Sequence, residues 1–254
     1  MTTTTLVTGG TGTLGRLVAE RLRTAGHEVR VLSRHALPYS VDLRRPDSGL
    51  DVALAGVGTV VHCASAPGGG DERAARRLIA AARRAGVGHL VYISIVGVDR
   101  VPLRYYRAKL AVEGLVERSG LEWSLLRATQ FHDLVVEMLT GMARPPVMVV
   151  PAGLTDQPVE VTEVADRLAE LARGGPVGRV PDLGGPEVRT VESLARAYLS
   201  ATGRRRRLVR VPLAGAAYRG FRDGGHLTSG PALLGTGTFE EYLARRFGPR
   251  EERG

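Results

Sequence analysis

The sequence predicts an α/β protein with a doubly wound parallel sheet and a small C-terminal lobe. Two observations carry this prediction. Short apolar, β-favouring runs alternate with amphipathic helical patterns through the first half of the 254-residue chain, as in folds whose parallel strands are joined by helices. A glycine-rich turn connects the first of these strands to the first helix. We therefore expect a single domain over residues 1–254, in which residues from about 131 onward form most of the lobe.

The first half of the chain alternates strongly between the two patterns. Strands are expected at Thr3–Thr8, Glu28–Ser33, Tyr39–Asp42, Thr59–Cys63, His89–Ser94 and Trp123–Arg127. Helices are expected at Leu14–Thr24, Ser48–Ala55, Asp71–Ala85 and Arg104–Ser119, each followed by a glycine that ends it. In the first helix, Leu14, Val18 and Leu22 fall on one stripe, which predicts the face that packs on the sheet.

The second half is patterned more loosely and is interrupted by prolines. Strands are expected at Val147–Val150 and Leu208–Val211, and helices at Thr162–Arg173, Thr190–Thr202 and Phe239–Phe247. The segment Asp223–Gly237 is rich in glycine and has no clear period, so we expect an irregular packed loop there, with a mobile lid as the alternative.

Composition excludes several classes of protein. The sequence has no apolar run of about 18 residues, so it predicts no membrane helix. The N-terminus lacks the charged region of a signal peptide. One cysteine, Cys63, excludes an internal disulfide and fits a cytoplasmic protein; we expect a small buried thiol rather than a nucleophile. The net charge of +9 is spread along the chain, without helix-turn-helix or zinc-ligand spacing. We therefore expect no nucleic-acid partner, no membrane partner and no metal.

The glycine-rich turn has the spacing of a dinucleotide-binding strand–turn–helix unit. Gly9 permits a tight turn, Gly12 lets a pyrophosphate approach the backbone, and Gly15 lets the helix pack closely on the sheet. The helix then directs free N–H groups and its positive dipole end at the phosphates. The alternative is a turn that binds nothing. The residues expected to contact a cofactor here are Gly9, Thr11, Gly12, Thr13, Leu14, Gly15 and Arg16.

The end of the second strand predicts which dinucleotide is bound. An NAD-binding fold usually places a carboxylate about 20 residues after the glycines, to bind the ribose 2′-hydroxyl. Ser33 and Arg34 occupy this position instead, and the guanidinium of an arginine can bind a 2′-phosphate through two parallel hydrogen bonds. We therefore expect NADP(H) rather than NAD(H), with Arg16 as a second positive group. Asp42 is expected to accept a hydrogen bond from the adenine amine, or else to be a turn residue.

Tyr105 and Lys109 are the expected catalytic pair. They are four residues apart, so a helix places both on one face. Lys109 is the only lysine among 35 basic residues, which indicates a role that needs a compact ammonium. An ammonium beside a phenol is expected to lower the pKa of the phenol and to make it a usable general acid or base. The alternative is an ordinary pair on the surface of a helix.

Together these motifs resemble the short-chain dehydrogenase/reductase superfamily. The stretches Ser94–Asp99, Tyr105–Lys109 with Glu113, Arg127–Phe131 and Gly184–Glu187 resemble its atypical, NmrA-like branch of NAD(P)H-binding proteins. The resemblance implies a Rossmann fold with a small substrate lobe and NADPH in the cleft. It implies that Cys63, Ala64 and Ser65 lie along the cofactor and that Ala128–Phe131 face the nicotinamide. It also makes Ser94 the nearest candidate for the catalytic serine, although the working hydroxyl often lies at positions that hold Ile95 and Val96 here.

The expected function is reduction of a small apolar or aromatic carbonyl, quinone or enone by NADPH. Tyr105 is expected to donate the proton, Lys109 to tune Tyr105 and hold the ribose, Ser94 to orient the carbonyl, and Phe131 with Tyr105 to contact the substrate. The alternative is a non-catalytic NADP(H) sensor that binds a protein partner, as other members of the branch do. A sugar-nucleotide epimerase or dehydratase is a third possibility. The expected oligomeric state is a monomer or a homodimer.

Overall fold

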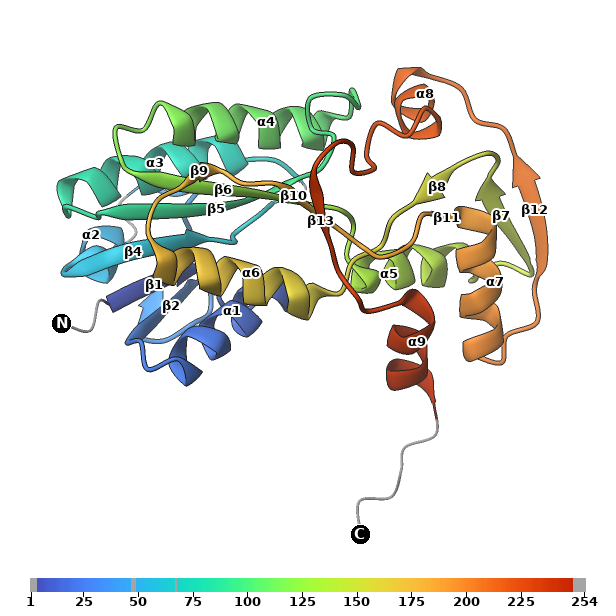
Figure 1. Cartoon of the computed structure of the whole chain (residues 1–254), viewed down its shortest axis with the longest axis horizontal. Coiled ribbons are helices and arrows are strands. Elements are labelled where there is room, and N and C mark those ends of the chain that lie inside the picture. Colours follow the sequence, from blue (N-terminus) through green and yellow to red (C-terminus); the bar gives the residue numbers. More distant parts are fainter. Residues whose placement is uncertain (1–3, 47–48, 67, 249–254) are drawn as a thin grey trace, which may run out of the picture.

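The computed structural model describes residues 4–46, 49–66 and 68–248, and its centre is a nine-stranded parallel sheet (Figure 1). The strand order is β13-β10-β6-β5-β4-β1-β2-β3, with β9 paired to β6. These strands are β1 (Thr4–Thr8), β2 (Val29–Ser33), β3 (Tyr39–Ser40), β4 (Val57–His62), β5 (His89–Ile95), β6 (Trp123–Ala128), β9 (Gly178–Arg179), β10 (Asp182–Gly184) and β13 (Ala232–Leu234).

The chain winds outward from the middle of this sheet in both directions. It begins in β1, proceeds to β2 and β3 on one side, and then crosses to β4, β5 and β6 on the other. The order therefore reverses between β1 and β4. In open parallel sheets a ligand binds at such a reversal, beyond the carboxyl ends of the strands. The predicted fold class, a doubly wound Rossmann-type α/β fold, is confirmed.

Helices cover both faces of the sheet, and alternate residues of each strand pack against the helices of one face or the other. Val7, Val61 and Val91 pack against the helices α1 (Thr13–Thr24) and α6 (Val161–Gly174). Their sequence neighbours point to the other face, because successive side chains of a strand alternate. The predicted stripe of the first helix is buried in the α1 face, as expected.

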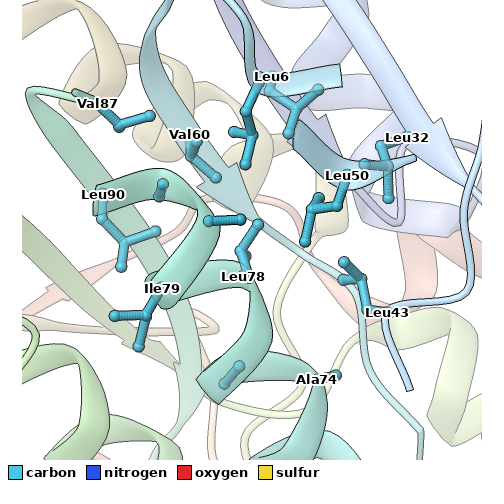
Figure 2. Packing of buried hydrophobic residues seen from close by; sticks show 14 of the residues in the cluster. Leu6, Leu32, Leu43, Leu50, Val60, Ala74, Leu78, Ile79, Val87 and Leu90 are labelled. Atoms are coloured by element: carbon cyan, nitrogen blue, oxygen red, sulfur yellow. The ribbon is translucent and has the colours of Figure 1, made fainter. Parts of the chain in front are cut away.

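The opposite face is covered by α2 (Leu50–Leu54), α3 (Asp71–Arg84) and α4 (Arg104–Glu117). Figure 2 shows Leu6, Val60 and Leu90 of the sheet gathered around Leu78 of α3. Both faces of the central strands are thus buried, which is why these strands read in the sequence as short, nearly continuous apolar runs.

An outer lobe lies beyond one end of the sheet, on the right in Figure 1. We define it as α5 (His132–Met142), β7 (Val147–Pro151), β8 (Thr155–Asp156), β11 (Arg189–Thr190), α7 (Val191–Ala201), β12 (Arg207–Val211), α8 (Ala216–Arg222) and α9 (Phe239–Phe247). β7 pairs with β12 in parallel, and β8 with β11 antiparallel. A separate core of residues from α5, β7, α7 and α9 holds the lobe together.

The expected elements of the first half are present, with ends shifted by one or a few residues. Two of the predicted first residues, Thr3 and Ser48, lie outside the described part of the chain. α5 is not predicted from the sequence because its apolar residues lie on more than one face: Val135, Val136 and Leu139 are buried, whereas Leu134 and Met138 are exposed. Such a helix shows no amphipathic period.

The glycine-rich segment Asp223–Gly237 is partly a strand. Its residues Ala232–Leu234 form β13, the edge strand of the sheet, paired with β10. The segment was missed as a strand because Leu233 and Leu234 are both exposed, which removes the alternation that marks a half-buried strand. Within the described ranges, no helix combines the length and the apolar character that crossing a membrane would need.

Candidate active site

Two adjoining cavities lie beyond the carboxyl ends of the central strands. The larger has a volume of about 560 Å³ and extends along the end of β2. The smaller, of about 240 Å³, extends over the ends of β5 and β6 towards α5. Gly9, Gly12, Cys63 and Ser65 line both, so the two cavities form one groove that runs across the reversal of strand order.

The glycine turn forms the floor where the two cavities meet. Gly9 adopts φ +65°, and a Cβ added to it would lie 2.8 Å from the backbone of Ala64. A Cβ on Gly15 would lie 2.3 Å from the carbonyl oxygen of Gly9. No side chain caps the first turn of α1, and that turn holds no acidic residue. The glycines leave the backbone accessible at this uncapped helix end, so its free N–H groups fit a phosphate group.

The wall of the larger cavity carries positive side chains. Ser33 and Arg34 line it as predicted, together with Arg44, which no sequence motif marks. The carboxylate of Asp42 accepts three hydrogen bonds from Arg44: from the main-chain N–H at 3.0 Å, from Nε at 3.0 Å and from Nη2 at 2.9 Å. Asp42, expected to meet an adenine or else to be a turn residue, thus accepts a main-chain hydrogen bond two residues on, as in a turn, and holds a guanidinium on the cavity wall.

Tyr105 and Lys109 lie together in the smaller cavity, on the first turns of α4. Lys109 is only 4% exposed, and its Nζ lies 5.8 Å from the centroid of the Tyr105 ring and 5.3 Å from that of Tyr92. The hydroxyl of Tyr105 lies 2.7 Å from Oγ of Ser65. Ser94, at the end of β5, lines the same cavity; it is buried, and its Oγ has no hydrogen-bond partner among the described residues.

Asp71, the first residue of α3, contacts both Ser65 and Lys109. Its Oδ2 accepts a hydrogen bond from Ser65 Oγ at 3.0 Å and lies 3.8 Å from Lys109 Nζ, and its Oδ1 accepts the N–H of Ala66 at 2.5 Å. The sequence shows Asp71 only as the start of a helix. No motif or spacing in the sequence marks Asp71 as part of the site.

A model of a family described as NAD(P)H-binding matches residues 9–179, which span the glycine turn, both cavities and most of the sheet. The chain belongs to this NAD(P)H-binding family.

Relatives of known activity agree with this membership. The chain is 32% identical to "(4-alkanoyl-5-oxo-2,5-dihydrofuran-3-yl)methyl phosphate reductase" of Streptomyces griseus, over 78% of this chain and 74% of the relative. It is 27% identical to quinone oxidoreductase 2 of Escherichia coli, again over 78% and 74%. The solved structure of the E. coli NADPH-dependent quinone oxidoreductase QOR2 with NADPH superposes with a TM-score of 0.77 at 22% identity, covering 96% of this chain and 99% of that one.

These findings identify the chain as an NAD(P)H-dependent oxidoreductase of the short-chain dehydrogenase/reductase type, in its NmrA-like branch. The resemblance drawn from the motifs is confirmed at that level. Within the family fold, all but one of the predicted site residues line one or both cavities. The exception is Arg16, which is exposed on α1 and lines neither. Those that line them are Gly9, Thr11, Gly12, Thr13, Leu14, Gly15, Ser33, Arg34, Asp42, Cys63, Ala64, Ser65, Ser94, Tyr105, Lys109 and Phe131.

The expected direction of the Tyr105 pKa is wrong. Burial raises the pKa of Tyr105, a hydrogen bond donated by Ser65 would act in the opposite direction, and the charge of Asp71 raises the pKa further. Burial also lowers the pKa of Lys109, although the negative charge of Asp71 acts to raise it. The sequence shows the ammonium beside the phenol, but the desolvation and the nearby carboxylate are products of the fold. The NAD(P)H-dependent oxidoreductase therefore holds Tyr105 as a neutral phenol.

The remaining wall of the smaller cavity is mostly apolar. It includes Ile93, Ile95, Ala128, Phe131 and the exposed Leu134 of the unpredicted helix α5. Cys63 is half-buried at the junction of the cavities, and burial raises the pKa of its thiol to about 12. A neutral thiol among these side chains adds to the apolar wall and is a poor nucleophile.

Proposed function

We propose that the protein reduces a small apolar or aromatic carbonyl, quinone or enone with NADPH, and that Tyr105 donates the proton. The observation that carries this proposal is the placement of the Tyr105 hydroxyl and the Lys109 ammonium in a cavity with largely apolar walls, directly beside the glycine turn. The names of the Streptomyces and E. coli relatives, a reductase of an alkanoyl-oxo-dihydrofuranyl methyl phosphate and a quinone oxidoreductase, support an enone or a quinone as the substrate.

The residues along the groove fit NADPH. The uncapped N-terminus of α1 would hold the pyrophosphate through backbone N–H groups. Arg34, with Arg44 on the same wall, would bind the 2′-phosphate through charge-assisted hydrogen bonds. Lys109, which makes no hydrogen bond to another described residue, has N–H groups to give to the ribose hydroxyls. The bound cofactor supplies the hydride.

The chain's own residues complete the reduction. A neutral Tyr105 holds the proton that the substrate oxygen needs, and the raised pKa of Tyr105 keeps that proton in place across the neutral pH range. The ammonium of Lys109 stabilises the phenolate that remains after the transfer. Ser94 has a hydroxyl with no described partner, which leaves it free to orient the substrate oxygen. The apolar wall around Phe131 keeps water away from the reacting carbon.

The first experiment follows NADPH consumption with a panel of quinones, aldehydes, ketones and enones. We expect turnover with at least one class, and a loss of about 10²–10⁴-fold in kcat for Tyr105→Phe with little change in NADPH affinity. Wild-type turnover in Tyr105→Phe would refute the proton-donor role. Tight NADPH binding without turnover on any compound would instead favour a sensor that responds to the cofactor.

A second experiment tests the choice of cofactor. Arg34→Gln is expected to weaken NADPH binding by about tenfold or more and to leave NADH binding unchanged, because one charge-assisted contact with a phosphate is worth about 1.5–3 kcal/mol. Arg173→Gln, an exposed arginine on α6 away from both cavities, is the matched control. Equal losses for the two cofactors in Arg34→Gln would contradict a 2′-phosphate contact.

A further inference from the structure

Ser65 stands between Tyr105 and Asp71 and has a single proton to give. Its Oγ lies 2.7 Å from the Tyr105 hydroxyl and 3.0 Å from Asp71 Oδ2. An ionised carboxylate only accepts hydrogen bonds. The proton of Ser65 is therefore directed at Asp71, and the hydrogen bond between the two hydroxyls must use the proton of Tyr105. In this arrangement Tyr105 is the donor and Ser65 the acceptor.

Ser65 could stabilise a Tyr105 phenolate only by turning its proton away from Asp71. The geometry of Asp71 opposes that turn. The carboxylate is 5% exposed and is held in place by the N–H of Ala66, and its Oδ2 also faces the ammonium of Lys109 at 3.8 Å. A buried, anchored carboxylate competes strongly for a hydroxyl proton, because charge-assisted hydrogen bonds are about twice as strong as neutral ones.

We infer that Asp71 is a positioning residue that holds the proton of Ser65 away from Tyr105 and thereby keeps Tyr105 a protonated donor. The inference rests on the proposed role of Tyr105 and adds two residues, Ser65 and Asp71, that act on the reaction through it. Nothing in the motifs of the sequence marks this function of Asp71. It arises because the loop between β4 and α3 returns the start of α3 to the N-terminal turns of α4.

Other titratable and charged groups also surround the pair, and the test must separate them from Asp71. Lys109 and Glu113 face the site from α4, and Arg127 of β6 pairs with Glu113. The remaining groups near Tyr105 or Lys109 are Tyr106 on α4, His62 and Cys63 at the end of β4, and Tyr92 on β5. All of these stay unchanged when only Asp71 or Ser65 is replaced.

The test measures the ionisation of Tyr105 directly, in the full chain and without turnover. Protein labelled with ¹³C at tyrosine Cζ is followed by NMR from pH 7 to pH 10, and the Tyr105 signal is assigned with Tyr105→Phe. In Asp71→Asn, Ser65 is released to donate to the phenolate and one negative charge is lost. We expect the ionised fraction of Tyr105 at pH 10 to rise about threefold or more, which is a shift of about half a pH unit. Glu72→Gln, the exposed neighbouring carboxylate on α3, should change nothing.

A double-mutant cycle separates transmission through Ser65 from the effect of charge alone. In a Ser65→Ala background, Asp71→Asn should produce less than half of the shift seen with Ser65 present, whereas in a Ser65→Thr background, which keeps a hydroxyl, the shift should persist. An equal shift in the Ser65→Ala background, or no shift in any background, would overturn the inference. If Asp71→Asn does not fold, Asp71→Ser takes its place in the same cycle.

A failure of this inference can be distinguished from a failure of the proposed function. If Tyr105→Phe turns over at the wild-type rate, the proposed proton donor fails, whatever the titration shows. If Tyr105→Phe is inactive and the titration of Tyr105 ignores Asp71, only the inference about Asp71 and Ser65 fails.

Discussion

Arg127 donates two hydrogen bonds to Glu113 in the core behind the site, from Nε to Oε1 at 2.8 Å and from Nη2 to Oε2 at 2.6 Å. The two side chains are 5% and 4% exposed. A third bond, from Nη1 to Asp99 at 2.8 Å, ties in the loop that follows β5. The pair thus joins β6 to α4, the helix that carries Tyr105 and Lys109.

Replacement of Arg127 should destabilise the fold strongly. Arg127→Met leaves the Glu113 carboxylate buried without a partner, and breaking a buried pair in this way costs about 3–5 kcal/mol. Replacing both partners, in Arg127→Met/Glu113→Leu, should recover most of that loss. Urea unfolding measures both. Arg76→Met, which breaks an exposed pair with Glu72, should cost less than about 1 kcal/mol. A comparable cost at positions 127 and 76 would contradict the buried character of the first pair.

Lys109 should not be replaceable by arginine. The buried Lys109 Nζ lies 5.3 Å from the centroid of the Tyr92 ring, 5.8 Å from that of Tyr105 and 3.8 Å from Asp71, and a longer, planar guanidinium cannot reproduce these contacts of a compact ammonium. Both Lys109→Met and Lys109→Arg should lose about tenfold or more in NADPH affinity and in kcat, because charge-assisted hydrogen bonds to the cofactor are lost or misplaced. Calorimetric titration and steady-state kinetics measure the two effects. Retention of wild-type values by Lys109→Arg would show that only the charge matters.

Gly15→Ala should damage cofactor binding through the backbone alone. The added methyl group would lie 2.3 Å from the carbonyl oxygen of Gly9, so the turn must open. We expect NADPH affinity to fall about tenfold or more, and stability to fall by about 1–3 kcal/mol, as in other overpacked sites. The control is Gly174→Ala in α6, where nothing lies within 4 Å of the added atom. That variant should bind NADPH normally and be equally stable or slightly more so.

Cys63 should react slowly with alkylating reagents up to high pH. Burial raises its pKa to about 12, and only the thiolate attacks. The rate with iodoacetamide should therefore rise about tenfold per pH unit from pH 8 to pH 10, without the plateau of an ordinary thiol that has a pKa near 8.5. The chain has one cysteine, so the label counts this site alone. A plateau near pH 9 would contradict the raised pKa of the Cys63 thiol.

The fold was predictable where a local pattern and its environment agree. The strands around Val7, Val61 and Val91 are buried on both faces and carry short apolar, β-favouring runs, so their positions could be predicted closely. α5 was not predictable in this way because Leu134, which lines the smaller cavity, and Met138 expose apolar side chains, which hides the helical period.

The site was predictable where a motif is contiguous, as in the glycine turn and in the spacing of Tyr105 and Lys109. Asp71 could not be found in this way. Its role depends on a loop that turns back to a helix far along the chain, and no spacing rule encodes that return. For the same reason the direction of the Tyr105 pKa was predicted wrongly, since burial and the charge of Asp71, which both raise that pKa, are products of the fold.

The edge strand β13 has a mechanical consequence. The chain passes between the sheet and the outer lobe at five places: after β6, between β8 and α6, after β10, before β13 and after β13. A lobe joined to a sheet by one linker can rotate about that linker as a hinge. This lobe is joined by five chain segments, so it cannot rotate as a rigid body unless all five segments change conformation together. Substrate access should therefore depend on local movement of side chains at the rim, and an exchange of lobes between relatives needs five matched splice points.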